Sequence, residues 1–251
     1  MPYSCNIILE ICANSLESAL AAEAAGADRI ELCSNLEAGG ITHSYGTIKL
    51  VHQKVSGPMS VLIRPRPGDH VYSDAEIEIM LEDIRVCKAL GIKAVTLGVL
   101  TETLIVDVSR TKALVDAARP MVVTFSRAFD ETDDLVQALE HVITTGCDRI
   151  LTSGGQKTAV DGQAAIKKLV GQSAGRIKVM AGGGIRPPNV VDLVQMTGVL
   201  EVHSSAISNQ VQNETTQGMF GAKPRTTDLA TAQKLADLLR EHFPAELDRS
   251  G

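Results

Sequence analysis

The sequence alternates eight times between a short apolar run and a helix-length amphipathic segment, and this rhythm restricts the fold more than any other feature. Such alternation is typical of βα units, in which parallel strands are covered by helices. Most of the runs are rich in Val, Ile and Leu, as expected of strands buried on both faces. The predicted strands cover residues 7–12, 29–33, 60–64, 94–97, 121–125, 149–152, 177–181 and 200–203.

Helix signals fall between the predicted strands. Segments that carry Ala, Leu, Glu, Gln and Lys at helical spacing cover residues 15–25, 74–90, 133–145 and 228–242. Ser73 and Glu76 have the spacing of a capping box, which predicts that a helix begins there. Glycine accepts the positive φ found just after a helix, and four predicted helices are followed by one, at Gly26, Gly91, Gly146 and Gly198.

One five-residue pattern occurs twice. Gly26-Ala27-Asp28-Arg29-Ile30 recurs 120 residues later as Gly146-Cys147-Asp148-Arg149-Ile150, at the entrances of the second and sixth predicted strands. Four units of about thirty residues separate the copies, as in a half-barrel repeat. With eight units in about 250 residues, we predict an α/β fold, a (βα)8 barrel of the TIM type. The alternative is an open doubly wound sheet, which favours a glycine-rich turn where this chain has Ala13-Asn14-Ser15.

Length and composition are those of one globular domain. The chain has 251 residues, of which 44% are hydrophobic and 22% charged, enough for a sizeable core. We therefore expect a single barrel domain over residues 1–251, with a long loop at about 206–227 before the C-terminal helix. The net charge of −6 provides no positive field for nucleic acid. No apolar run reaches the roughly 18 residues of a membrane span, so we expect neither nucleic acid nor a membrane as partner.

The N-terminus lacks the charged-then-apolar pattern of a signal peptide, so we expect a cytoplasmic protein. Five cysteines, an odd number without a secretory signal, indicate reduced thiols rather than a disulfide framework. Any function of these thiols is then metal binding or redox chemistry.

Charged and thiol side chains interrupt the apolar strands at a spacing of two residues. The pattern occurs in Glu10-Ile11-Cys12, Glu31-Leu32-Cys33, Arg64-Pro65-Arg66 and Glu201-Val202-His203. Residues two apart on a strand share a face, and buried charges need partners. Because barrels carry function at the C-terminal ends of their strands, the candidate catalytic residues are Glu10, Glu31, Arg64, Arg66, Arg127, Asp130 and His203. The alternative interpretation is an ion network that only stabilises the fold.

Two polar turns follow the seventh and eighth predicted strands. Gly183 and Gly184 come after the seventh strand, and Ser204 and Ser205 come after the eighth. Loops at these positions commonly bind phosphate through backbone N–H groups, and glycine lets the anion approach closely. These four residues are therefore candidates for an anion site, the alternative being an ordinary tight turn from strand to helix.

Ordered blocks along nearly the whole chain resemble the CutC copper homeostasis family. The blocks are Glu10-Ile11-Cys12, residues 26–33, Gly39-Gly40, Ile63-Arg64-Pro65-Arg66, Tyr72-Ser73-Asp74, Arg127-Ala128-Phe129-Asp130, Leu151-Thr152-Ser153-Gly154 and Glu201-Val202-His203-Ser204-Ser205. The resemblance implies a (βα)8 barrel, a cytoplasmic location, a homo-oligomer and a part in copper handling. One position departs from the family pattern, because Ser126 stands where the family usually has histidine. A hydroxyl does not titrate near neutral pH, so Ser126 is not assigned the role of that histidine.

The copper role that the resemblance implies makes the thiols of Cys12 and Cys33 candidate ligands. Cu(I) is soft and favours thiolate ligands in low coordination numbers, and these two cysteines lie on neighbouring predicted strands. We therefore predict that they bind Cu(I), the alternative being that both are small core side chains. The competing hypothesis is an enzyme that acts on a small anionic or phosphorylated metabolite, which the arginines would clamp. A third is a scaffold barrel with an indirect copper role, so enzymatic activity stays open.

Overall fold

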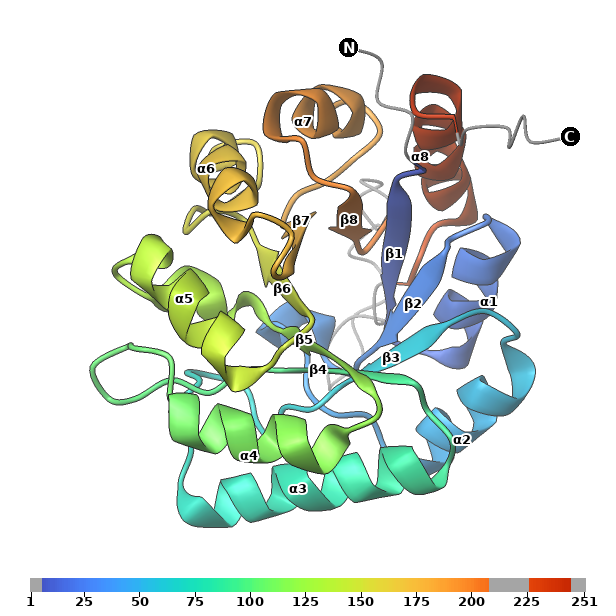
Figure 1. Cartoon of the computed structure of the whole chain (residues 1–251). Coiled ribbons are helices and arrows are strands. Elements are labelled where there is room, and N and C mark those ends of the chain that lie inside the picture. The colour runs from blue at the N-terminus through green and yellow to red at the C-terminus, as the bar shows by residue number, and fades with distance from the viewer. Residues whose placement is uncertain (1–5, 208–225, 245–251) are drawn as a thin grey trace, which may run out of the picture.

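The computed structural model describes residues 6–207 and 226–244, which form a closed barrel of eight parallel strands (Figure 1). Each strand pairs with its neighbours in chain order, and β8 closes the ring against β1. The strands are β1 (Ile8–Ala13), β2 (Arg29–Leu32), β3 (Met59–Leu62), β4 (Ala94–Leu97), β5 (Val122–Phe125), β6 (Arg149–Thr152), β7 (Lys178–Gly182) and β8 (Glu201–Ser204). The (βα)8 barrel predicted from the sequence is therefore confirmed.

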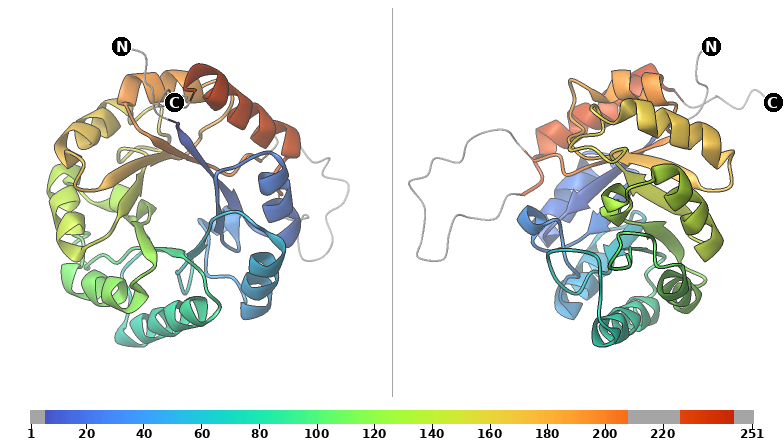
Figure 2. Two further views of the ribbon diagram at one scale, coloured as in Figure 1. Left: turned by 45° about the vertical axis from the view of Figure 1, so that its right-hand side comes forward. Right: turned by 90° about the vertical axis from the view of Figure 1, so that its left-hand side faces the viewer.

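In the described part of the chain, eight α-helices alternate with the strands and surround the barrel as an outer ring (Figure 2). They are α1 (Leu16–Ala24), α2 (Tyr45–Lys54), α3 (Asp74–Ala89), α4 (Val108–Ala118), α5 (Leu135–Thr145), α6 (Gln163–Ser173), α7 (Val190–Thr197) and α8 (Leu229–His242). Short 3-10 helices, η1 (Leu36–Ala38) and η2 (Arg127–Glu131), follow β2 and β5. The predicted loop at about 206–227 lies largely outside the described residues, which stop at 207 and resume at 226.

The local signals in the sequence correspond to the observed elements. Every strand lies within two residues of its predicted ends. The capping box at the start of α3 is formed, and the backbone N–H of Ser73 donates to the Glu76 carboxylate at 2.8 Å. Gly146 and Gly198 end α5 and α7 with φ values of 82° and 75°. Helix boundaries are thus fixed by capping chemistry that is local in the sequence.

Outward-facing strand residues form the main hydrophobic core between the barrel and the helices. Leu9 and Ile11 of β1, with Ile30 and Leu32 of β2, are each at most 2% exposed and belong to one apolar cluster. Burying one such side chain contributes about 1.5–3 kcal/mol. Side chains alternate along a strand, so the intervening residues, such as Glu10, face the inside of the barrel.

The repeated five-residue pattern has a counterpart inside the barrel. Arg29 opens β2 and Arg149 opens β6, and both guanidinium groups contact the carboxylate of Glu201 on β8. The Nη2 atoms lie 2.7 Å (Arg29) and 3.1 Å (Arg149) from Glu201 oxygens, and all three side chains are at most 12% exposed. Burial alone would raise the pKa of Glu201, but Arg149 and Arg29 hold it below its usual range. One buried anion therefore links both halves of the barrel.

The aspartate of the repeat also has one role in both copies. Asp28 Oδ2 accepts a hydrogen bond from the backbone N–H of Leu9 at 2.8 Å, and Asp148 Oδ2 accepts one from Val123 at 2.8 Å. Each aspartate thus ties the entrance of its strand to the preceding strand, β1 or β5. The half-barrel relation is therefore present in the hydrogen bonds as well as in the sequence.

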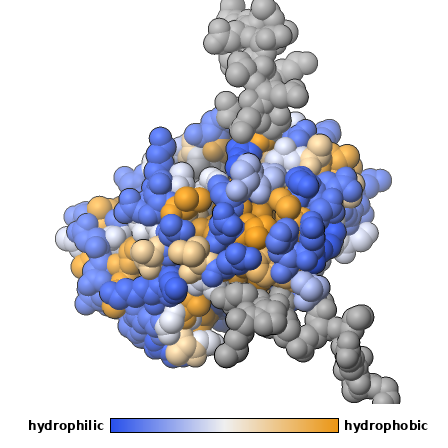
Figure 3. Space-filling view, turned by 90° about the horizontal axis from the view of Figure 1, so that it is seen from above, coloured by the Kyte–Doolittle hydropathy of each residue, from blue (hydrophilic) through white to orange (hydrophobic). Residues whose placement is uncertain are grey.

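The outer surface mixes polar and apolar side chains. Figure 3 views the side of the barrel that carries α7 and α8, where hydrophobic side chains gather amid a largely hydrophilic face. Met196 in α7 and Leu229 in α8 are 53% and 46% exposed. Exposed apolar residues are also normal on monomers, so the homo-oligomer stays a prediction. Among the described residues, no helix combines the length and the apolar character needed to cross a membrane.

Replacing Glu201 by Gln should destabilise the barrel strongly, because two buried guanidinium groups then lose their shared anion. Removing one partner of a buried ion pair costs roughly 3–5 kcal/mol of unfolding free energy, which urea denaturation followed by circular dichroism measures. Glu140→Gln is the matched control, since Glu140 pairs with Arg176 on the surface at 2.7 Å and little change is expected. Equal destabilisation by both variants would contradict the role assigned to Glu201.

Candidate functional site

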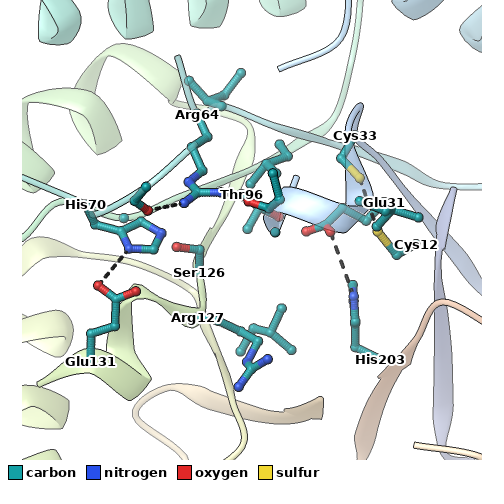
Figure 4. Close-up of a pocket in the computed structure, with 18 of the residues that line it drawn as sticks. Cys12, Glu31, Cys33, Arg64, His70, Thr96, Ser126, Arg127, Glu131 and His203 are labelled. Carbon is teal, nitrogen blue, oxygen red and sulfur yellow. Dashed lines mark hydrogen bonds and ion pairs between the residues drawn. The ribbon is translucent and has the colours of Figure 1, made fainter. Parts of the chain in front are cut away.

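The C-terminal ends of the strands surround a pocket of about 500 Å³ (Figure 4). The residues that carry its chemistry are Cys12, Glu31, Cys33, Arg64, His70, Tyr72, Thr96, Ser126, Arg127, Glu131 and His203. Figure 4 shows two distinct ends. The thiol end consists of Cys12, Cys33, Glu31 and His203. The arginine end consists of Arg64, His70 and Glu131, together with Tyr72, whose ring centroid lies 6.4 Å from that of His70. Six of the candidate catalytic and copper-binding residues predicted from the sequence therefore meet here, namely Cys12, Glu31, Cys33, Arg64, Arg127 and His203.

Two thiols meet at the thiol end. Cys12 lies near the end of β1 and Cys33 directly follows β2, and their Sγ atoms are 3.4 Å apart. Both residues are buried, with 4% and 1% exposure. The loop after β2 comes close at Gly40, where an added Cβ would lie 3.4 Å from Cys33 Sγ and 2.7 Å from Leu62 Cδ2. The lack of room for a Cβ and the φ of +85° both require glycine at this position. The close approach of the loop encloses the thiols.

The Cys12 thiol is protonated at neutral pH. The contact with Cys33 and burial raise the pKa of Cys12 well above its ordinary value of 9.0, and the Glu31 carboxylate adds to the effect. Only the thiolate is a metal ligand. A metal ion that binds Cys12 must therefore displace a proton.

Glu31 and His203 face each other beside the thiols. His203 Nε2 lies 3.9 Å from Glu31 Oε2, and one ligand atom each from Cys12, Glu31 and His203 lies within 4.8 Å of the others. Burial lowers the pKa of His203, but the carboxylates of Glu31 and Glu10 outweigh it and raise that pKa above 6.5. Burial raises the pKa of Glu31, although His203 partly offsets this. Sulfur, imidazole and carboxylate groups together are the ligand types of metal sites.

Glu10 supports His203 from the side away from the pocket. Its Oε1 accepts a hydrogen bond from His203 Nδ1 at 2.7 Å, and Arg29 contacts its other oxygen. Burial alone would raise the pKa of Glu10, but His203 and Arg29 lower it to about 2. An ionised carboxylate keeps a proton on Nδ1 and leaves Nε2 facing the pocket. Glu10 is 1% exposed and does not line the pocket, so it positions His203.

Arg64 dominates the arginine end. Its Nη1 donates to the backbone carbonyls of Ala38 and Gly40, at 3.0 and 2.7 Å, and its Nη2 donates to that of Gly68. These bonds join the loops that follow β2 and β3. Arg64 is only 6% exposed, and no carboxylate in the described residues lies within 4.0 Å of its guanidinium nitrogens.

His70 and Glu131 complete the arginine end, and neither was predicted from the sequence. His70 Nδ1 lies 3.1 Å from Glu131 Oε2, and His70 is 8% exposed. Burial lowers the pKa of His70 more than the Glu131 carboxylate raises it, so the ring is neutral at neutral pH. The only available signal was position, since both residues lie in segments that follow strands, His70 after β3 and Glu131 at the end of η2, at the end of the barrel that carries function.

Arg127 lines the pocket, whereas Asp130 lies behind it. Asp130 Oδ1 accepts hydrogen bonds from the Thr152 hydroxyl and from the backbone N–H groups of Ser153 and Gly155. Its Oδ2 accepts one from Arg127 Nε at 2.9 Å. Asp130 therefore ties Arg127 to the loop after β6 and acts as a positioning residue.

Arg66 does not line the pocket, although it is only two residues from Arg64. Its Nε donates to the Glu76 carboxylate at 2.5 Å, and its Nη2 donates to Asp69 at 3.0 Å and to the Val71 carbonyl at 2.8 Å. The side chain is 36% exposed. Arg66 thus orders the loop that leads into α3.

The pocket lining contains none of the four residues predicted to bind an anion, which are Gly183, Gly184, Ser204 and Ser205. Gly183 lies against Arg127, because an added Cβ would be 3.4 Å from Arg127 Cζ. The Ser204 hydroxyl donates to the Ile185 carbonyl at 2.8 Å and accepts from the Ala206 N–H at 3.1 Å. It joins the loops after β7 and β8, and the anion site stays a prediction.

Ser126 lines the pocket and precedes η2. Its Oγ accepts a hydrogen bond from the backbone N–H of Ala128 at 3.3 Å. A Cβ at Gly98 would lie 2.4 Å from this Oγ, so the glycine after β4 makes room for the serine. The hydroxyl can still donate to a ligand, but it cannot act as a base near neutral pH.

Known proteins resemble this chain over most of its length. The family model described as CutC family matches residues 7–208. A CutC family protein of Chromobacterium violaceum is 47% identical over 199 residues, which cover 79% of this chain and 81% of that protein. A human protein named copper homeostasis protein cutC homolog is 46% identical over 203 residues, which cover 81% of this chain and 74% of that protein.

Solved structures with the same barrel fold also resemble this chain. A CutC crystal structure from Streptococcus agalactiae has a TM-score of 0.76 and 34% identity, and covers 79% of this chain and 98% of its own. Phosphoribosylanthranilate isomerase of Thermotoga maritima has a TM-score of 0.59 over 94% of this chain and 99% of its own, at 14% identity. At that identity the likeness concerns the barrel fold alone.

The His203 imidazole should titrate above 6.5, and Glu31→Gln should lower its pKa because Glu31 helps to raise it. NMR titration of the ring Cε1–H measures both values. A raised pKa means that the stability contributed by protonated His203 is complete below about pH 6.5 and is lost as the pH rises through the raised pKa. Glu131→Gln is the control, since Glu131 contacts His70 instead. A His203 pKa that ignores Glu31→Gln would contradict the assigned coupling.

Proposed function

This chain belongs to the CutC family, and we propose that it acts in copper homeostasis by binding Cu(I) through Cys12 and Cys33. The observation that carries the proposal is the pair of Sγ atoms, 3.4 Å apart and enclosed at the thiol end of the pocket. Cu(I) selects soft ligands, and cysteine thiolates are the softest that a protein offers. Burial of the pair also keeps the bound ion away from bulk water.

His203 is the third donor of the proposed copper site. Glu10 holds its Nδ1, so Nε2 is the nitrogen available to a metal, and imidazole is an accepted copper ligand. A carboxylate that fixes a ligating histidine through its second nitrogen is a common support of metal sites. Glu31 is left out of the ligand set, because carboxylate oxygens are hard donors that suit Mg²⁺, Ca²⁺ or Mn²⁺ better than Cu(I).

Copper binding at this site is coupled to proton release. Contact with Cys33 and burial raise the pKa of Cys12, and the neighbouring carboxylates raise that of His203, so both groups keep their protons to a higher pH than the free side chains do. Metal ligands must be deprotonated. The proposed site therefore takes up Cu(I) more tightly as the pH rises.

The size of the pocket favours a second candidate function. A volume of about 500 Å³ is far larger than a single ion needs and falls in the range of small-molecule sites. At its arginine end, Arg64 is buried with no carboxylate of the described chain beside it. The second candidate is an enzyme that acts on a small anionic metabolite, with Glu31 or His203 as acid or base.

Reduced thiols are a requirement of the proposed copper site. Reducing compartments keep cysteines in this state, so we retain the cytoplasm as the proposed location. The net charge of −6 supports a small-molecule or metal partner rather than nucleic acid. A homo-oligomer is carried over from the family resemblance as part of the proposal.

An anaerobic titration against a strong Cu(I) chelator tests the copper site. The wild type should bind close to one Cu(I) per chain, and the double variant Cys12→Ser/Cys33→Ser should lose this binding. Affinity should fall when the pH is lowered from about 8 to about 6, because protons compete for the ligands.

Cys87→Ser is the matched control for the thiols. Cys87 is buried in α3, outside the pocket lining, and burial raises its pKa to about 12. This variant should keep the Cu(I) affinity of the wild type. Tight binding that survives loss of Cys12 and Cys33, or binding that Cys87→Ser abolishes equally, would overturn the proposed site.

A further inference from the structure

Buried polar atoms without a hydrogen-bond partner concentrate in the pocket. Of the six such side-chain atoms in the part of the chain that the structure describes, three belong to residues that line it, namely Glu31 Oε1, Arg64 Nε and Tyr72 OH. Buried polar groups of folded proteins are nearly always paired, because an unpaired one has lost its hydrogen bonds to water. The Tyr72 hydroxyl lies beside the Arg64 guanidinium, but Arg64 Nε, Tyr72 OH and Glu31 Oε1 complete no hydrogen bond within the described chain. This points to a ligand that supplies the missing partners.

Arg64 retains donors for such a ligand. A guanidinium carries five N–H protons, and three of them are used by the carbonyls of Ala38, Gly40 and Gly68. Nε–H and one Nη2–H remain, and these two nitrogens form an edge that binds a carboxylate through two parallel hydrogen bonds. Figure 4 shows the guanidinium directed into the pocket, between His70 and Thr96. No carboxylate of the described chain lies within 4.0 Å of this buried guanidinium.

Glu31 offers hydrogen-bond acceptors at the thiol end, where Arg64 offers donors at the arginine end. The residue is 4% exposed, its Oε2 lies 3.9 Å from His203 Nε2, and its Oε1 has no partner. The thiols and the imidazole are the donors of the proposed copper site, which leaves Glu31 out. Thr96 and Cys12 lie beside the Glu31 carboxylate, and its Oε1 can accept a hydrogen bond from an organic group. A buried carboxylate is best matched by a cationic donor such as an ammonium group.

We propose that the pocket binds a small organic molecule with a carboxylate at one end and an ammonium group at the other. The carboxylate pairs with Arg64, beside the Tyr72 hydroxyl, and the ammonium group pairs with Glu31, next to the thiols. The proposal rests on the same pocket as the proposed copper site and names the organic ligand that this pocket takes. A volume of about 500 Å³ accommodates a molecule of this size.

The arrangement favours a carboxylate over a phosphate at Arg64. Phosphate sites in barrels are built from backbone N–H groups in the loops after the last two strands, and the corresponding residues here, Gly183 and Ser204, do not line the pocket. Arg64 offers two remaining donors, which match the two oxygens of a carboxylate. Inorganic phosphate is therefore the discriminating probe.

Calorimetric titration of the full chain in metal-free buffer tests the proposal. Glycine, β-alanine, γ-aminobutyrate and δ-aminovalerate carry both end groups at increasing separations, while butyrate and butylamine carry one end each. One member of the series should bind at least about tenfold more tightly than either single-ended compound and than inorganic phosphate, because it forms charge-assisted hydrogen bonds at both ends.

Variants at both ends identify the contacts. Arg64→Lys keeps the charge but loses the two-pronged edge, and Glu31→Gln removes the anion, so each should weaken binding about 10- to 100-fold. Arg176→Gln is the matched control, because Arg176 pairs with Glu140 on the surface and lies outside the pocket, and it should leave binding unchanged. Thermal unfolding verifies that each variant is folded.

The outcomes separate this proposal from the copper site. The proposal would be overturned if no member of the series bound more tightly than the single-ended compounds, or if phosphate bound as tightly as the best member. Equal weakening by Arg176→Gln would also overturn it. Cys12→Ser/Cys33→Ser should lose Cu(I) and keep the organic ligand, whereas Arg64→Lys should lose the ligand and keep Cu(I). Failure of copper binding alone would therefore leave the inferred ligand class standing, and the reverse also holds.

Discussion

The interior of this barrel depends on a balance of buried charge. Glu201 neutralises Arg29 and Arg149, which enter from strands four positions apart around the ring, and Arg29 also contacts Glu10. Each of these ions would be costly to bury alone, so each fixes the position of its partners. Glu10 then extends the network to His203. These ion pairs lie beneath the pocket and fix the geometry of its floor. They hold His203 in one orientation through Glu10, which does not line the pocket.

Above this floor, the pocket brings together two chemistries. At one end, Cys12 and Cys33 provide soft sulfur donors in a buried setting. At the other end, Arg64 is fixed by carbonyls of two loops and still has donors that face the cavity. Soft donors suit a Cu(I) ion, and a planar guanidinium suits an organic acid. Because both ends open on one cavity, the copper role of the family and a metabolite-binding role need not be alternatives.

The sequence was sufficient for the strands and for the groups on their inner faces, because alternation along a strand is a local rule. It placed Cys12 and Cys33 on neighbouring strands but could not decide whether their sulfurs meet, which depends on a register that pairs Cys12 with Glu31. Loops were harder. Arg64 and Arg66 look equivalent in the sequence, yet Arg64 turns into the pocket while Arg66 pairs with acids near α3. Their difference arises from tertiary contacts of the loop after β3, which local patterns do not encode.

The enclosure of the two thiols limits how a copper ion could reach the proposed site and leave it. Cys12 and Cys33 are 4% and 1% exposed and lie within a cavity of about 500 Å³, which admits a metabolite but not a folded domain. At the proposed copper site, an ion would therefore reach the sulfurs through the cavity and not across the outer surface of the barrel. A protein carrier would have to deliver it by a side chain or a loop small enough to enter that cavity.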